Sequence, residues 1–314
     1  MPQPVPDDRK PIDRRAVVIM VMLCVIWGTQ QTVVKIAAAQ MSPTLQLGLR
    51  SAVAAVATLI VAWARGETRW LSRETWLPGM LVGVFFGLEF VFAGEALRFT
   101  SASHVTVYLY SAPVMMALVL GLMRRDERLN AGQWLGVALA FAGVAVTFLG
   151  RSDTAQFPAM RLGDLLALAA AVSWATTAVV LRGSRLANAP ATITLFYQLA
   201  GAAIGTTAMA VALGETTVRP NATLVLALLW LIMVVAFGSY LAWFSLLRQY
   251  SAARLGVLSF MTPVFGVAAG IVLLGDRIDA GFAFGAMMIL GGIVIATTGI
   301  SGQFLRGWRG QPAA

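Results

Sequence analysis

The sequence predicts an all-α, polytopic integral membrane protein whose ten transmembrane helices form two inverted repeats of five. The first observation is composition: of 314 residues, 59% are apolar and only 12% are Asp, Glu, Lys or Arg, with a mean hydropathy of +0.79. An ordinary soluble domain carries about 25% charged residues. A soluble enzyme of this length is therefore excluded. The other two observations are a series of long apolar runs and an internal repeat.

The apolar runs are long enough to be membrane spans, since crossing about 30 Å of hydrocarbon takes about 20 apolar residues. Ten such runs are present: 16–39, 43–63, 76–97, 101–123, 131–149, 163–181, 190–214, 222–247, 252–274 and 280–300. Short connections, such as 98–100 and 275–279, predict antiparallel neighbouring helices. Outer-membrane strands are excluded because they alternate in polarity, whereas these runs are apolar on all sides.

The first run has some features of a cleaved signal peptide. Two arginines precede it, and Ala37–Ala39 resembles a cleavage site. The run nevertheless contains Gln30, Gln31 and Lys35, where a signal peptide would be apolar. We therefore expect the first helix to remain in the membrane.

The distribution of basic residues between the connections predicts the orientation of the helices. With the N-terminus inside, sixteen lie in cytoplasmic segments: Arg9, Lys10, Arg14, Arg15, Arg65, Arg69, Arg73, Arg124, Arg125, Arg128, Arg182, Arg185, Arg248, Arg254, Arg306 and Arg309. Five lie outside: Arg98, Arg151, Arg161, Arg219 and Arg277. This asymmetry predicts ten spans, with the terminal segments 1–15 and 301–314 both in the cytoplasm.

The internal repeat aligns residues 128–150 with residues 277–299 at an offset of 149. Six of the 23 aligned positions are identical in sequence: Arg128/Arg277, Ala131/Ala280, Gly132/Gly281, Gly136/Gly285, Gly143/Gly292 and Gly150/Gly299. The chain thus divides into halves at 16–149 and 163–300. Because each half has five spans, the second enters the membrane from the opposite side. Inverted repeats are typical of secondary transporters, although a duplication retained only for stability is the alternative.

The two halves also share a pattern that resembles a known family. Each half ends in an acidic residue, a short turn and a glycine-rich helix, and each first helix contains a tryptophan. The residues concerned are Trp27, Pro113, Glu127, Gly132, Gly136 and Gly143, and then Trp174, Pro263, Asp276, Gly281, Gly285 and Gly292. This pattern resembles the EamA-domain branch of the drug/metabolite transporter superfamily. The resemblance implies a ten-helix inner-membrane carrier, often an exporter of amino acids or related metabolites.

The charged residues inside the predicted spans include Glu89, Lys35 and Arg50. A charge at the bilayer centre costs about 2.5–3.5 kcal/mol on insertion scales, so it normally faces a cavity or a partner. Glu89 is in the middle of the third span, where it could titrate, bind a cationic group, or pair with Lys35 or Arg50. These three residues are candidates for coupling or ion pairing, and a purely structural pair is the alternative.

A set of polar and aromatic side chains lies within the same spans. Buried Tyr and Trp residues keep a polar group that needs a partner. We expect the set to line a central cavity for substrate, with helix packing or the lipid interface as the alternative for any single member: Trp27, Gln30, Gln31, Glu89, Tyr108, Tyr110, Trp174, Thr177, Tyr197 and Tyr240. Tyr197 is followed by Gln198, and Trp243 lies close to Tyr240.

Other residues near the spans have more than one interpretation. Pro113 and Pro263 are hinge candidates because proline removes a backbone hydrogen bond, but a kink without motion is equally possible. Glu95 and Arg98, three residues apart, predict a local surface pair. His104 is interpreted as an interfacial group, with a proton relay as the alternative.

The predicted function is a secondary transporter that exports amino acids or related small metabolites by alternating access. Its expected partners are a small-molecule substrate and the lipid bilayer of the bacterial inner membrane, and we expect a monomer. A multidrug or organic-cation exporter is one alternative. A lipid-modifying intramembrane enzyme is another, although His104 is the single histidine available to it. We expect no catalytic residue, no cofactor, no metal, and no nucleic-acid binding, since the basic residues are scattered.

Overall fold

The computed structural model describes residues 13–123, 129–149, 157–247, 249–250 and 252–298, and every regular element in these residues is a helix. The elements are α1 (Arg14–Ile36), α2 (Pro43–Ala64), η1 (Glu67–Trp70), α3 (Arg73–Phe99), α4 (Ala102–Leu109), α5 (Ala112–Met123), α6 (Ala131–Leu149), α7 (Met160–Arg182), η3 (Arg185–Asn188), α8 (Ala191–Ala212), α9 (Ala222–Leu229), η4 (Trp230–Gly238), α10 (Ser239–Leu247), α11 (Ala252–Ser259), α12 (Thr262–Ala269), η5 (Gly270–Leu274) and α13 (Ala280–Thr298).

The helices have the length and composition of membrane spans. Within the described residues, seven are long and apolar enough to cross a bilayer, and three shorter apolar helices cover Ala222–Gly238, Thr262–Leu274 and Ala280–Ala296. The predicted class, an all-helical polytopic membrane protein, is confirmed. The acidic residue of the first repeat, Glu127, lies outside the described residues.

The fourth and ninth runs, predicted as single helices, are each broken at the same place. α4 ends at Leu109 and α5 begins at Ala112, so that Pro113 is its second residue. In the same way α11 ends at Ser259, and Pro263 is the second residue of α12. Proline has no N–H to donate, and it is therefore tolerated in the first turn of a helix but not in its interior. Each proline thus starts a new helix after a two-residue break.

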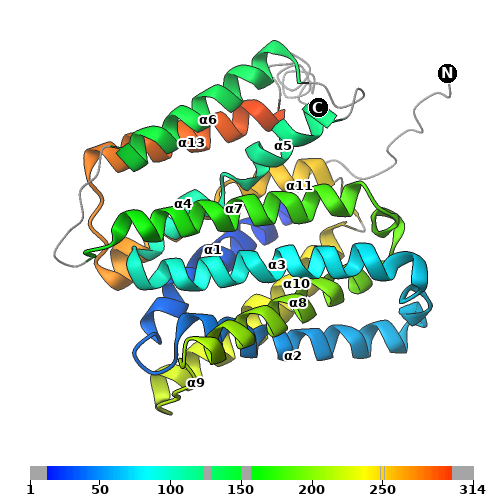
Figure 1. Cartoon of the computed structure of the whole chain (residues 1–314). Helices are drawn as coiled ribbons and strands as arrows, with labels where there is room; N and C mark the ends of the chain where they lie inside the picture. Colours follow the sequence, from blue (N-terminus) through cyan, green and yellow to red (C-terminus); the bar gives the residue numbers. More distant parts are fainter. Residues whose placement is uncertain (1–12, 124–128, 150–156, 248, 251, 299–314) are drawn as a thin grey trace.

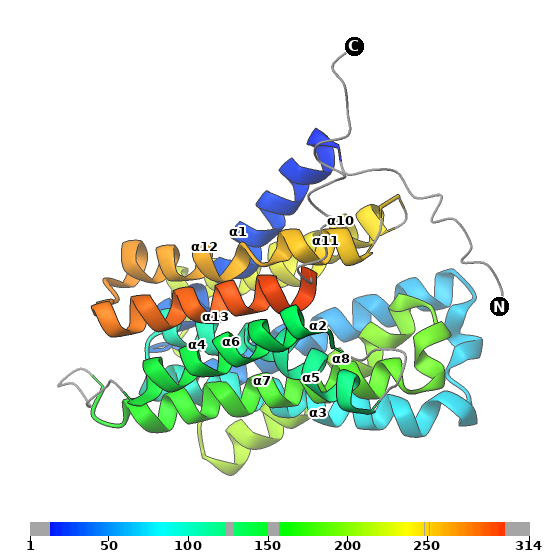
Figure 2. The same cartoon turned by 90° about the horizontal axis from the view of Figure 1, so that it is seen from above.

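The helices pack in a small number of extensive pairs. α6 packs on α13, α2 on α8, α3 on both α7 and α8, and α1 on α12. Figure 1 shows α6 and α13 side by side at the top of the view and α2 at the bottom. Figure 2, seen from above, again places α13 beside α6. The core is therefore shared among many helices, as expected of a bundle in lipid.

Glycines allow the closest of these helix pairs to approach. A Cβ on Gly201 of α8 would lie 2.0 Å from the carbonyl oxygen of Gly83 in α3. On α6 and α13, Cβ atoms on Gly136 and Gly285 would lie 2.4 Å from the partner helix. These two glycines therefore pack against the partner helix, whereas a Cβ on Gly281 would meet only the Asp279 side chain of its own turn, at 3.2 Å.

The start of α1 is tied to the segment between α10 and α11. Asp13 caps α1 by accepting a hydrogen bond from the Ala16 N–H at 2.8 Å, and it accepts another from the Tyr250 hydroxyl at 2.7 Å. These hydrogen bonds lower the pKa of the Asp13 carboxyl; the bond from the Ala16 N–H has the larger effect and the bond from the Tyr250 hydroxyl the smaller. The same contact raises the pKa of Tyr250.

The contact between α3 and α8 predicts an effect of adding one methyl group. Gly201→Ala has no room beside the backbone of Gly83, so the two helices must separate. We expect the free energy of unfolding to fall by about 1–3 kcal/mol, as for other overpacked sites. Denaturant titration in mixed micelles measures it. Gly205→Ala, one turn further along α8, is the control and should change stability little, because a Cβ there would lie 3.6 Å from the nearest atom, at ordinary van der Waals distance. Equal effects of the two substitutions would contradict the packing argument.

Candidate functional site

Two opposite charges lie in the interior of the bundle. Arg50 of α2 and Glu89 of α3 are only 2% and 6% exposed. Arg50 Nη1 donates a hydrogen bond to Gln30 Oε1 of α1 at 2.7 Å, and its guanidinium carbon lies 4.7 Å from the centre of the Phe90 ring. Arg50 and Glu89 attract each other electrostatically, but no salt bridge joins these two described side chains. Glu89 therefore faces Arg50, one of the two partners expected from the sequence.

Several polar atoms in this region are buried without a hydrogen-bond partner. Within the described part of the chain these include Arg50 Nε, Glu89 Oε2 and Gln31 Oε1. Burying a polar atom without a partner costs roughly 1–3 kcal/mol, and more for a charged group. The interior therefore retains an unused hydrogen-bond donor and unused acceptors, which is the pattern expected of a polar binding site.

Two tyrosines complete the surroundings of Glu89. Glu89 interacts electrostatically with Tyr110, at the end of α4 beside the helix break, and with Tyr240 of α10. Tyr110 contacts Trp174 of α7 edge-on, with ring centres 5.5 Å apart. We call Gln30, Arg50, Glu89, Tyr110 and Tyr240 the central cluster.

Trp27 flanks the central cluster on the side of α10. Its indole Nε1 donates a hydrogen bond to the Ser239 hydroxyl at 2.9 Å, directly before Tyr240 in the chain. Its ring also packs edge-on against Trp243, with centres 5.7 Å apart. Helices α1, α2, α3, α4, α7 and α10 thus all contribute to one polar-aromatic region.

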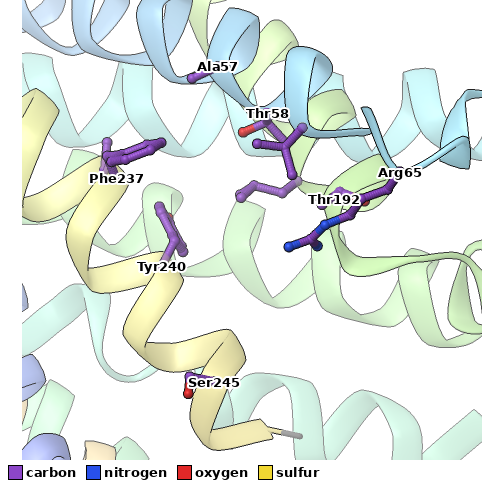
Figure 3. Close-up of a pocket in the computed structure, with 10 residues that line it drawn as sticks. Ala57, Thr58, Arg65, Thr192, Phe237, Tyr240 and Ser245 are labelled. Carbon is purple, nitrogen blue, oxygen red and sulfur yellow. The ribbon is translucent and has the colours of Figure 1, made fainter. Parts of the chain in front are cut away.

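A cavity of about 150 Å³ reaches the central cluster between α2, α8, η4 and α10. It is lined by Ala57, Thr58, Val61, Arg65, Thr192, Leu195, Ala236, Phe237, Tyr240 and Ser245. Figure 3 shows Phe237 and Tyr240 facing Thr58 across this space, with Arg65 further along. The cavity thus leads from Arg65, just after α2 ends, to Tyr240.

A network of polar contacts joins the chain at the opposite end of α2 and α3. Glu95 accepts hydrogen bonds from the Thr44 hydroxyl at 2.6 Å and from Arg98 Nη1 at 2.7 Å. Arg98 also forms a salt bridge with Glu215, beyond α8, at 2.6 Å. The predicted pair of Glu95 and Arg98 forms, but it is not a surface pair, because Glu95 is buried and Arg98 also reaches Glu215 in another part of the chain. We call Thr44, Glu95, Arg98 and Glu215 the end network.

Lys35 belongs to this end of the bundle and not to the central cluster. Its ammonium group donates hydrogen bonds to the backbone carbonyls of Leu97 and of Thr100, the latter at 2.7 Å, and lies 4.7 Å from the centre of the Phe157 ring. It also lines a hollow of about 620 Å³ beside the end network. The structure therefore does not bring Lys35 to Glu89, because the carbonyls at the end of α3 hold it.

Three other candidates also lie away from the central cluster. Tyr108 is fully buried, and its hydroxyl donates a hydrogen bond to Asp164 Oδ2 at 3.4 Å. The ring of Tyr197 packs against Gly79 between α8 and α3. The Thr177 hydroxyl donates a hydrogen bond to the Ser173 carbonyl of its own helix at 3.0 Å. The spacing of these three residues along the chain does not indicate their partners.

Sequence reasoning missed Ser239 and Thr262 as parts of the site. Thr262, at the break before α12, has a buried hydroxyl without a hydrogen-bond partner among the described residues. The signal that would have indicated it is its position next to Pro263, which matches the position of Ala112 before Pro113. No group of three or more His, Cys, Asp or Glu side chains in the described residues is arranged to hold a metal ion.

Comparison with known proteins identifies relatives over nearly the whole chain. The model of the EamA-like transporter family matches residues 14–149 and again residues 161–298. A "Probable amino-acid metabolite efflux pump" of Salmonella typhimurium is 29% identical over 90% of this chain and 94% of its own length. The "Aromatic amino acid exporter YddG" of Ancylobacter novellus is 28% identical, covering 81% of this chain and 88% of its own.

A solved structure described only as "Crystal structure of protein" has the same fold. It superposes with a TM-score of 0.63 and 24% sequence identity, covering 90% of this chain and 98% of the other. The helical arrangement described above therefore has an experimental counterpart.

The end network predicts a contribution to stability that depends on burial. Glu215→Gln removes a partly buried ion pair with Arg98, and we expect it to lower the free energy of unfolding by about 1 kcal/mol. The matched control is Glu74→Gln, which breaks an exposed pair with Arg185 and should cost less than about 0.5 kcal/mol. Denaturant titration of both variants measures the difference. A larger loss in Glu74→Gln would show that the end network does not hold this end together.

Proposed function

Because the chain belongs to the EamA-like transporter family, we propose that it is a secondary transporter that exports amino acids or related small metabolites by alternating access. It is a multi-pass membrane transporter and not an enzyme, as the family and the relatives indicate. Two of those relatives carry names that refer to amino acids. The substrate assigned to this chain rests on the chemistry of the central cluster.

One observation carries the proposal: an arginine and a glutamate are buried near each other, and each retains an atom without a partner. A guanidinium group suits a carboxylate, and a carboxylate suits an ammonium group. Arg50 and Glu89 together therefore match the two charges of an α-amino acid. Tyr110, Tyr240 and Trp174 supply aromatic surface for an apolar side chain. The residues for substrate are thus the central cluster with Trp27, Gln31 and Trp174.

The two ends of the bundle differ in a way that suits alternating access. The cavity beside Arg65 reaches Tyr240 from one end, while the end network ties the chain together at the other. The breaks before Pro113 and Pro263 interrupt the helices on either side of the central cluster. Discontinuous helices at the binding site are typical of secondary transporters. We therefore assign both prolines to hinges at which the half-helices pivot.

The ten-span architecture of two inverted five-helix repeats, at 16–149 and 163–300, is part of the proposal. Its support is the double family match and the pattern of helix pairs. If α1 corresponds to α7, and α4–α5 to α11–α12, the packing of α1 on α12 has its counterpart in the packing of α7 on α4 and α5. In the same relation α2 corresponds to α8, and α6 corresponds to α13. A twofold relation therefore maps each of these two packed pairs onto itself.

The orientation is proposed from the charges of the connections. The excess of basic residues on one side places Arg65 and both terminal segments, 1–15 and 301–314, in the cytoplasm of a bacterial cell with the protein in its inner membrane. The end network then lies on the outer side. Because one chain contains both repeats, we propose a monomer that needs no nucleic acid or other macromolecular partner.

An organic-cation exporter is the second candidate, and one observation favours it. Glu89 with Tyr110, Tyr240 and Trp174 offers a carboxylate among aromatic rings, which suits a cation without a carboxylate. Arg50 argues against this substrate, because its positive charge repels a cation in the same site. The two candidates therefore predict opposite effects of removing Arg50.

Reconstitution into proteoliposomes tests the charge assignment with three related probes. We use phenylalanine, phenethylamine, which lacks the carboxylate, and phenylpropionate, which lacks the ammonium group. Arg50→Gln should reduce phenylalanine transport by about tenfold or more, since losing one member of a buried charge contact costs roughly 2–5 kcal/mol. It should reduce phenethylamine transport far less. Glu89→Gln should reduce phenylalanine transport similarly and phenylpropionate transport far less.

Glu74→Gln is the control, because it removes an exposed carboxylate far from the central cluster. It should transport all three probes as the wild type does. Equal losses of all three probes in Arg50→Gln would contradict the charge assignment. The organic-cation exporter would instead be supported if the wild type transported phenethylamine faster than phenylalanine. Glu89→Gln would then abolish phenethylamine transport.

A further inference from the structure

A second buried polar group, separate from the central cluster, joins the corner between α3 and α4 to α7. His104 Nδ1 of α4 lies 2.8 Å from Asp164 Oδ1 of α7. The same carboxylate accepts hydrogen bonds from the Thr100 hydroxyl at 2.8 Å and from the Tyr108 hydroxyl at 3.4 Å. His104 and Asp164 are 1% and 2% exposed.

The pair connects the two segments that match the family model. His104 lies in the first match, at 14–149, and Asp164 lies in the second, at 161–298. Phe282 of α13, also in the second match, stacks flat on the imidazole with ring centres 4.1 Å apart and an interplanar angle of 2°. The imidazole is therefore held between α7 and α13. Any movement of one segment against the other at this place must break these contacts.

The strength of this connection depends on one proton. Histidine is the side chain that ordinarily changes its charge between about pH 5 and 8. With the proton, His104 and Asp164 form an ion pair with a charge-assisted hydrogen bond. Without it, the carboxylate keeps its charge in a buried place and faces a neutral ring, which binds it less strongly. Proton binding therefore strengthens the contact between the two matched segments.

The other charged groups around the corner are compatible with a proton at this site. From the segment before α13, Asp276 accepts hydrogen bonds from Ser103 N at 3.0 Å and from its hydroxyl at 2.6 Å. From α1, Lys35 donates a hydrogen bond to the Thr100 carbonyl at 2.7 Å. On α7 itself, Arg161 lies in the turn before Asp164. The carboxylates of Asp164 and Asp276 thus flank the corner, and the Lys35 ammonium group is engaged with backbone carbonyls.

We propose that His104 and Asp164 form a proton-binding site that couples transport to pH. The bound proton stabilises the arrangement of α4, α7 and α13 seen here, in which the end network is intact, and its release allows these helices to separate. The site shares no residue with the central cluster. The proposal rests on the transporter family and on this geometry, and it does not depend on which substrate the central cluster binds.

The chain offers a direct measurement, because His104 is its one histidine. Protein produced with isotope-labelled histidine and an affinity tag without histidine, in lipid nanodiscs, gives a single imidazole signal in nuclear magnetic resonance. We expect this signal to change between about pH 5 and 8.5 as the ring titrates. Asp164→Asn should move the midpoint of that change. A signal that stays constant over the whole range would overturn the proposal.

A second measurement tests whether the proton strengthens the contact between the segments. The apparent melting temperature of the wild type should rise as the pH falls from about 8 to 5.5, since the proton binds the assembled form more tightly. His104→Gln and Asp164→Asn should lose this dependence, whereas Glu74→Gln should keep it. A wild-type pH profile in His104→Gln would overturn the proposal. Should His104→Gln fail to fold, Asp164→Asn and the wild-type resonance titration still decide.

Transport then tests the coupling. Phenylalanine flux of the wild type in proteoliposomes should change by about threefold or more across the same pH range. In His104→Gln the flux should be the same at both pH values. If the flux of this variant still depended on pH, the proposed coupling of transport to pH would be overturned. The resonance titration and the melting measurement need no substrate. If the Arg50→Gln experiment contradicts the amino-acid proposal, these two measurements still test the proton site, so the two failures are distinguishable.

Discussion

The structure depends on one constraint: inside a bilayer, a polar group finds its partner within the protein or has none. Water is absent from the hydrocarbon region, and each unsatisfied group there costs several kcal/mol. Most buried polar groups accordingly have internal partners, such as the Thr206 hydroxyl, which donates a hydrogen bond to the Ala202 carbonyl. The groups that depart from this behaviour therefore indicate where another molecule is expected.

Seen in this way, the buried charges of the chain fall into two kinds. Two carboxylates near the ends of the helices have several partners: Asp164 accepts three hydrogen bonds or ion-pair contacts, and Glu95 accepts two hydrogen bonds. Those in the interior, Arg50 and Glu89, keep atoms without partners. Engaged charges hold helices together, and unengaged charges leave room for a charged ligand. In the proposed function, the engaged charges fix the state of the carrier and the unengaged charges select its substrate.

The sequence predicted the apolar runs, the helical class and Glu89 as a charge within a span, because composition and hydropathy determine these properties locally. It did not predict which charges meet. Lys35 and Arg50 were equally suitable partners for Glu89 by sequence alone. In the structure Lys35 is bound to the carbonyls of Leu97 and Thr100, which leaves Arg50 to face Glu89. Asp164 escaped notice for the same reason, since its partner His104 lies sixty residues away. Partners across a bundle depend on how helices pack, which a single sequence does not encode locally.

The distribution of small residues and prolines distinguishes closely packed helices from interrupted ones. Where Gly136 and Gly285 bring α6 and α13 into backbone contact, the two helices have no freedom to slide without losing that contact. α4–α5 and α11–α12 instead have breaks beside the central cluster, and there the interrupted backbone allows a change of angle. In the proposed alternating access, small rotations at the two breaks open the ends of the bundle while the α6–α13 pair stays rigid. The His104–Asp164 contact is placed beyond one of these breaks, where such a rotation has its largest displacement.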